Sequence, residues 1–147
     1  MEPEMCSKLG LSLHHVGIVV ANIAEQRGFY VDHLGYRERT PVIHDPVQTA
    51  YVQFFSIPGS DHCLELVAPD GENSKLTYAS RQGNSLNHLC YACGEVGSAF
   101  DDLWSAGCYR ISPPTPAVAF EGRPVAWLMS KDRLLIELVQ RGGPGSF

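Results

Sequence analysis

The sequence has little that would direct it to a membrane or to a nucleic acid. No apolar run approaches the roughly 20 residues that a membrane-spanning helix needs. The chain has 11 lysines and arginines against 16 acidic residues, a formal net charge of −5 and no basic block. This composition argues against nucleic acid or an anionic membrane as the main partner and predicts that neither is bound.

Signals for secretion are also missing. No charged segment followed by an apolar one opens the chain, so we expect no signal peptide. The number of cysteines is five, and an odd number favours reduced thiols in the cytoplasm over a disulfide framework. With 147 residues, of which 44% are hydrophobic, the sequence predicts one globular domain over residues 1–147.

A strand with histidines at its centre, LSLHHVGIVV at 11–20, organises the first half of the chain. Side chains alternate between the two faces of a strand, so His15 shares a face with Gly17, and Ile18 lies on the apolar opposite face. Glu65 follows His15 by 50 residues, in a second strand that reads LELVAP. A carboxylate between two leucines points away from the face that the leucines bury.

The second half repeats this plan. His88 lies in the strand-like segment LNHLCYAC, and Glu137 follows it by 49 residues in IELVQ. Each half also has a helix-like segment between these strands, FYVDHLGY at 29–36 and FDDLWSAGCY at 100–109. The sequence therefore contains an internal repeat with a period of about 72 residues.

The repeat predicts an α+β fold made of two βαβββ modules with mixed sheets, at residues 11–69 and 86–140. Asn22 is expected to cap the first helix and Gly35 to end it. Prolines 113, 114 and 116 predict a stiff extended loop between two strands. The expected strands are 11–20, 36–45, 49–57, 62–67, 86–93, 109–112, 124–129 and 134–139, and the expected helices are 23–34, 75–81 and 96–106.

The two histidines and two glutamates carry the chemistry of the repeat. A buried carboxylate is costly unless it pairs, takes a proton or binds a cation. If the two modules bring His15, Glu65, His88 and Glu137 to one point, these residues suit one divalent transition metal ion (Ni, Co, Zn, Mn or Fe). The alternative is that each is a core residue with an ordinary hydrogen bond, and spacing alone does not decide between the two.

Other candidates are weaker. His44 precedes a turn at the end of a strand, where the rim of a pocket is one possibility and a surface position is the other. Cys90 and Cys93 are three apart on a strand and so face opposite sides, which favours two packed thiols over a zinc or redox pair. His14 and His33 are expected to be structural or surface residues, and His62 to be exposed beside a turn.

These motifs resemble the vicinal oxygen chelate superfamily, which includes glyoxalase I, methylmalonyl-CoA epimerases, extradiol dioxygenases and bleomycin resistance proteins. The resemblance covers residues 12–140, and HHVGIVV, LELVAP, LNHLCYA and LLIELVQ match the segments that carry the metal ligands of the family. It implies two βαβββ modules that form a cup around one metal ion. It also implies that the four ligands are His15, Glu65, His88 and Glu137, and that the protein is a homodimer.

Within the superfamily, the segments HVGIVV, ELVAP and GRPVAWL resemble the methylmalonyl-CoA epimerase branch. That likeness implies a metal-dependent epimerase or isomerase that removes a proton next to a carbonyl or thioester and forms a stabilised enolate. The substrate is then a small molecule, an acyl-CoA or a thiol adduct. Glu137 or His44 is expected to act as acid or base. The epimerase branch uses a glutamate near its second strand, and His44 is the nearest equivalent here.

Two other activities remain open under the same resemblance. The first is glyoxalase I (lactoylglutathione lyase), which uses the same enolate chemistry but returns the proton to the neighbouring carbon. The second is a non-catalytic binding or resistance protein, although such proteins lack the four ligands. A ring-cleaving dioxygenase is disfavoured because it uses two histidines and one carboxylate, usually in a chain about twice this length.

Overall fold

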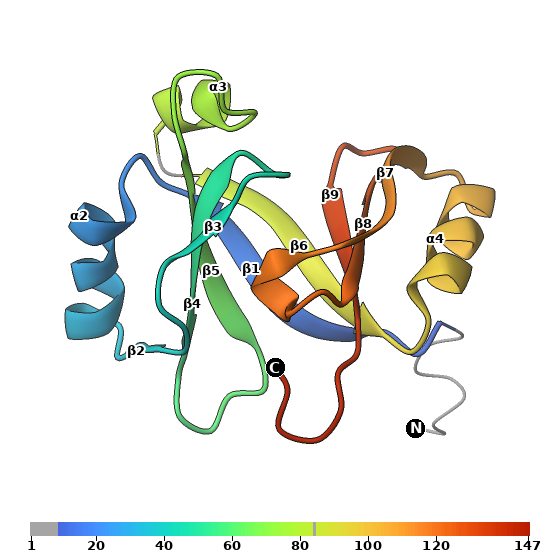
Figure 1. Ribbon diagram of the computed structural model, residues 1–147, viewed down its shortest axis with the longest axis horizontal. Coiled ribbons are helices and arrows are strands. Elements are labelled where there is room, and N and C mark those ends of the chain that lie inside the picture. Colours follow the sequence, from blue (N-terminus) through green and yellow to red (C-terminus); the bar gives the residue numbers. More distant parts are fainter. Residues whose placement is uncertain (1–8, 84) are drawn as a thin grey trace. The chain divides into compact units, whose positions relative to one another are not determined.

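The computed structural model describes residues 9–83 and 85–147 (Figure 1). Their contacts divide the chain into two compact units. The N-terminal unit is 15–87, and the C-terminal unit is 88–147 together with the segment that ends at His14. Each unit combines helices with a mixed sheet, so the predicted α+β class is confirmed. In the described part of the chain, no helix is long and apolar enough to cross a membrane.

The sheet of the N-terminal unit has the order β2-β4-β5-β1, and β3 pairs with β4. The pairing of β1 with β5 is parallel, and the pairs made by β4 are antiparallel. The bounds of these strands are Ser12–Val19 (β1), Arg37–Glu38 (β2), Ile43–Asp45 (β3), Ala50–Ser56 (β4) and Cys63–Pro69 (β5).

Helix α2, Ile23–Gly28, begins as the sequence predicts, because the side chain of Asn22 accepts a hydrogen bond from the backbone N–H of Glu25 at 3.0 Å. A π-helical turn, η1, Phe29–His33, continues it. The helix flanks the sheet (Figure 1) and packs on β4 and β5. The core between them contains mainly buried aliphatic and aromatic side chains, namely Val20, Ile23, Phe55, Leu64, Leu66 and Ala68.

The prediction of one continuous strand over 36–45 is wrong. The structure has two short strands, β2 and β3, with Thr40 and Pro41 between them. Proline has no backbone N–H and cannot donate to the neighbouring strand. Next to Pro41, a side chain makes a contact with β4: the hydroxyl of Thr40 accepts a hydrogen bond from the backbone N–H of Phe54. A short helix, α3, Thr77–Arg81, lies in the segment between the two repeats, as expected.

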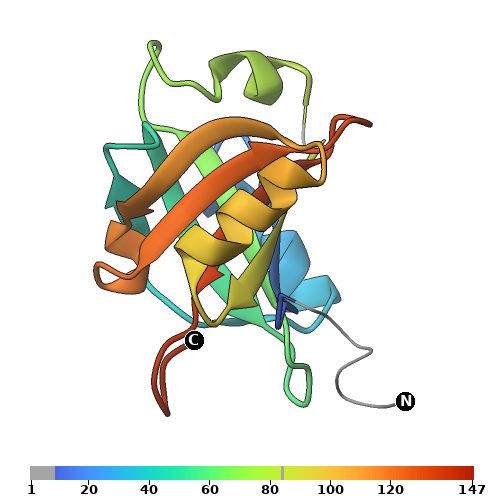
Figure 2. The same ribbon diagram turned by 90° about the vertical axis from the view of Figure 1, so that its right-hand side faces the viewer.

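The sheet of the C-terminal unit has the order β6-β9-β8-β7, again with one parallel pairing, β6 with β9. Helix α4, Val96–Ser105, crosses one face of these strands (Figure 2). Leu128, Leu138 and Phe100 are among the residues buried between helix and sheet. The strand bounds are Ser85–Cys93 (β6), Tyr109–Pro116 (β7), Pro124–Met129 (β8) and Leu135–Gln140 (β9).

The predicted proline loop is also corrected. Strand β7 runs through Pro113, Pro114 and Pro116, with register shifts between Arg110 and Thr115. It is the last strand in the order of this sheet, and an edge strand tolerates residues that cannot donate a hydrogen bond. A 3-10 turn, η2, Val118–Phe120, follows it.

Candidate functional site: two buried histidine–glutamate pairs

In the N-terminal unit, His15 and Glu65 form a buried pair. Glu65 on β5 lies opposite Gly17 on β1, two residues after His15. The Nε2 atom of His15 is 3.3 Å from Oε1 of Glu65. His15 is fully buried and Glu65 is 6% exposed. The ring of Phe54, which lies opposite Glu65 on β4, meets the imidazole edge-on with 5.1 Å between ring centroids.

The C-terminal unit has the same arrangement. Glu137 on β9 lies opposite Cys90 on β6, again two residues after the histidine, His88. The Nε2 atom of His88 is 3.4 Å from Oε1 of Glu137. His88 is 2% exposed and Glu137 is 6% exposed. The repeat seen in the sequence therefore holds at the level of strand register.

The geometry of each pair suits two ligands of one metal ion. The separations of 3.3 and 3.4 Å exceed the usual 2.7–3.2 Å of an N–H···O hydrogen bond. Two ligand atoms, each about 2.0–2.2 Å from the same ion, lie roughly 2.8–3.6 Å apart at octahedral to tetrahedral angles. An imidazole nitrogen and a carboxylate oxygen, both withdrawn from water, are also donors that divalent transition metals accept.

Two buried thiols, Cys63 and Cys93, are poor metal ligands. Cys63 lies opposite His15 in the β1–β5 register, and burial raises the pKa of its thiol, with Arg39 opposing this. Burial also raises the pKa of Cys93, which packs in the core under α4 and whose Sγ donates to the carbonyl of Val139. A thiol binds metal as the thiolate, so a raised pKa disfavours ligation.

Cys90 and Cys93 lie on opposite faces of β6 and both are buried, which confirms the prediction of two packed thiols. Cys90 shares its face with His88.

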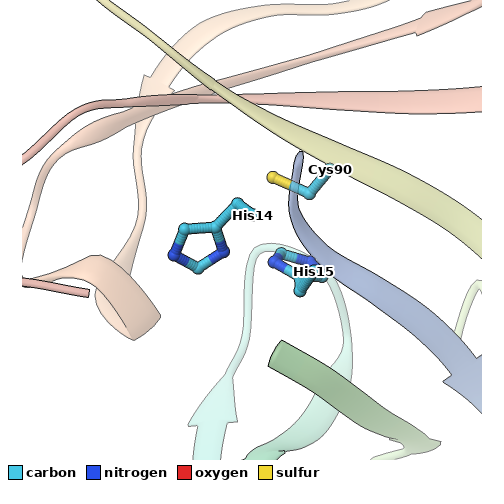
Figure 3. A group of neighbouring side chains, drawn as sticks. All are labelled: His14, His15 and Cys90. Carbon is cyan, nitrogen blue, oxygen red and sulfur yellow. The ribbon is translucent and has the colours of Figure 1, made fainter. Parts of the chain in front are cut away.

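Figure 3 shows Cys90 together with His14 and His15, which are consecutive residues of β1. A ring nitrogen of His14 and Sγ of Cys90 lie within 4.8 Å of each other.

His14 is a packing residue, as expected. The centroid of its ring lies 5.4 Å from that of Phe120, which it meets edge to face, and 5.4 Å from that of Phe147. His33 is exposed at the end of η1, as the sequence predicts. His62 is half-buried rather than exposed, and its Nδ1 lies 2.9 Å from the hydroxyl of Ser60 in the preceding turn.

His44 lies on the other face of its sheet. It is opposite Tyr51 in the β3–β4 register, whereas Phe54, three residues along β4, is opposite Glu65. Side chains alternate along a strand, so Tyr51 and His44 project from the face opposite to that of Phe54 and Glu65. The side chain of His44 is 48% exposed, and its Nε2 is 2.9 Å from Oδ2 of Asp70.

The sequence analysis did not identify Trp127, which contacts the His88–Glu137 pair. Trp127 on β8 lies directly opposite Glu137, and its ring meets that of His88 edge-on with 4.8 Å between centroids. Alternation along β8 gave the signal, because Ala126 and Leu128 are buried core residues and Trp127 must face the other way.

The likeness to known proteins agrees with this architecture. The family profile of the glyoxalase/bleomycin resistance protein/dioxygenase superfamily matches residues 14–127. An ethylmalonyl-CoA/methylmalonyl-CoA epimerase from Cereibacter sphaeroides is 29% identical over 132 residues, which cover 87% of this chain and 96% of the relative. The mitochondrial methylmalonyl-CoA epimerase of Dictyostelium discoideum is 27% identical over 141 residues, covering 91% of this chain and 81% of that protein.

Among solved structures, the methylmalonyl-CoA epimerase from Mycobacterium tuberculosis superimposes with a TM-score of 0.74 at 25% identity. The superposition covers 89% of this chain and 88% of that one. The predicted superfamily and its fold are thereby confirmed. The chain belongs to the glyoxalase/bleomycin resistance protein/dioxygenase superfamily.

Proposed function

We propose that this protein is a divalent-metal-dependent epimerase that removes and returns a proton next to a thioester, with a methylmalonyl-CoA-like substrate. The observation that carries the proposal is the likeness to the ethylmalonyl-CoA/methylmalonyl-CoA epimerase, which extends over 96% of that enzyme. The two buried histidine–glutamate pairs support it, because they supply the residue types that this chemistry needs.

The second part of the proposal is that His15, Glu65, His88 and Glu137 hold one metal ion together. Three observations support it: the matched register of the two pairs, the spacing of each pair, and the burial of both carboxylates. A donor set of two imidazoles and two carboxylates suits Ni, Co, Zn, Mn or Fe. If the ion takes more than four ligands, positions remain for a substrate.

A divalent ion held by these residues would supply a Lewis acid for negative charge on the substrate oxygen next to the reacting carbon. Glu137, when it does not hold the ion, is proposed to take the proton from one side of that carbon. A base must lie within hydrogen-bond reach of the proton that it removes. Glu137 shares a sheet face with His88 and Trp127, and the burial of Glu137 and His88 limits the water beside the reacting carbon.

An epimerase also needs a second group that acts on the other side of the reacting carbon. The sequence assigns this role to His44, and the assignment stays a prediction. The exposure of His44 and its contact with Asp70 are observations against it. The expected homodimer and cytoplasmic location also stay predictions.

The direct test is deuterium incorporation at C2 of methylmalonyl-CoA in heavy water, followed by NMR, with the metal-loaded protein. The proposal expects rapid exchange that a strong chelator stops and that added Co or Ni restores. Ethylmalonyl-CoA in a parallel assay measures which 2-alkyl group is preferred. A protein that loads metal but catalyses no exchange with either thioester contradicts the proposal.

The two other activities open in the sequence are outcomes of the same experiment. Conversion of the hemithioacetal of methylglyoxal and glutathione, without acyl-CoA exchange, indicates a lactoylglutathione lyase. Tight binding of either substrate without turnover indicates a binding protein of the same superfamily.

A further inference from the structure

The indole N–H of Trp127 is a donor with no acceptor. Among the described residues, Trp127 Nε1 is one of the few buried side-chain nitrogen or oxygen atoms with no hydrogen-bond partner. Buried polar groups are nearly always paired, and tryptophan usually finds a partner for its N–H. A buried donor left open in a folded protein calls for a physical explanation.

The position of this donor gives that explanation. Trp127 lies directly across from Glu137, and its ring packs edge-on against His88. These neighbours hold the indole in place. Its N–H can therefore donate to a ligand without the loss of side-chain freedom that a flexible donor would undergo on binding. A fixed donor in a site without water stabilises negative charge more strongly than the same donor in water.

We propose that Trp127 donates a hydrogen bond to the substrate oxygen that gains negative charge when the α-proton leaves. This inference rests on the proposed function and names one more residue of the same site. The oxygen belongs to a thioester or carboxylate group next to the reacting carbon, and Glu137, across the strand pair, is the proposed base for that carbon. The open N–H in the free protein becomes paired only when the charged oxygen is present.

The test is Trp127→Phe, which removes the N–H and keeps an aromatic ring. The control is Trp104→Phe, since Trp104 is half exposed on α4 and stacks on the guanidinium of Arg110 at 3.9 Å. For Trp127→Phe we expect kcat for α-proton exchange to fall roughly 100- to 1,000-fold, as for other donors to a developing charge, with KM changed less than about threefold. We expect Trp104→Phe to match the parent.

Stability separates this role from a merely structural one. Removal of an unpaired buried donor should leave the melting temperature of Trp127→Phe equal to that of the parent or higher. A tryptophan that serves only packing predicts the reverse, a lower melting temperature with kcat unchanged. Equal kcat in Trp127→Phe and the parent overturns the inference while leaving the proposed epimerase activity in place.

A second measurement needs no turnover. The chain has two tryptophans, so a ¹⁵N-labelled sample gives two indole signals, which the two variants assign. In zinc-loaded protein, methylmalonyl-CoA or malonate should move the Trp127 N–H proton signal downfield and slow its exchange with solvent, and leave the Trp104 signal in place. If malonate alone does this and no thioester exchanges its proton, the donor is supported and the proposed function fails. If neither ligand moves the Trp127 signal, the inference fails.

Discussion

Glu65 lies opposite Gly17, two residues after His15, just as Glu137 lies opposite Cys90, two residues after His88. The parallel pairing in each unit thus sets a histidine and a glutamate at the same offset. Parallel strands need a long connection, and in each unit that connection is the segment of about fifty residues that separates the histidine from the glutamate. The duplicated spacing in the sequence is therefore a consequence of duplicated strand register.

The role of Glu137 is tested by Glu137→Gln. The amide keeps the shape of the side chain but is a weaker metal ligand and cannot accept the substrate proton. We expect weaker metal binding and a fall in the exchange rate of at least about 100-fold, the usual contribution of a positioned base. Glu121→Gln, at an exposed turn, is the matched control. A Glu137→Gln protein that is active and fully loaded with metal would refute the assignment.

His44 is tested by His44→Gln, measured in the same exchange assay. Because His44 is exposed and lies on the face opposite to Glu65, the structure favours a rate within about threefold of the parent. A fall of more than tenfold in kcat would support the acid/base role expected from the sequence. Asp70→Asn, which alters only the partner of His44, shows whether an effect depends on their contact.

The thiols give a prediction for chemical reactivity. Burial raises the pKa of Cys63 and Cys93, so at pH 8 a smaller fraction of each is thiolate than in an exposed cysteine. We expect iodoacetamide to modify the partly exposed Cys108 before Cys63 and Cys93, which should react only at higher pH or in urea. Peptide mass mapping over time measures this order. Modification of Cys63 at the rate of Cys108 in the native protein would contradict it.

The cap of α2 gives a prediction for stability. Asn22→Ala removes the acceptor for the backbone N–H of Glu25, so we expect the free energy of unfolding in urea to fall by about 1 kcal/mol. Asn22→Asp keeps the acceptor and should remain within roughly 0.5 kcal/mol of the parent. Equal losses in the two variants would show that the cap is not the cause.

The sequence predicted the repeat, the metal-ligand candidates and most strands, because these depend on local alternation and on spacing. Asn22 and Gly35 set the ends of the first helical segment as expected, and the positive φ of Gly35, 83°, is the conformation that glycine adopts easily. The predictions of a continuous strand over 36–45 and of a strand that ends at 112 were wrong, and in both places a proline is the cause. Pro41 lies between β2 and β3, which pair with β4 separately, whereas β7 continues through Pro113, and these pairings are invisible in the sequence.

The pairing partners within each site were also beyond the sequence. Alternation placed Glu65 and Glu137 away from their leucine and isoleucine neighbours, but only the register shows which residue of β1 or β6 each one opposes. Trp127 shows what else the sequence could not predict. Its face follows from alternation, yet its open N–H depends on every neighbour in the folded chain.

Metal content per chain tests the central proposal most directly. It is measured by elemental analysis on the purified protein, on His88→Ala and on the control His62→Ala, whose histidine contacts a turn hydroxyl. We expect about one divalent transition metal ion per chain in the parent and in His62→Ala, and a clear loss in His88→Ala. No bound metal in the parent, and no rise in melting temperature with added Ni, Co, Zn or Mn, would contradict a metal site built from the two histidine–glutamate pairs.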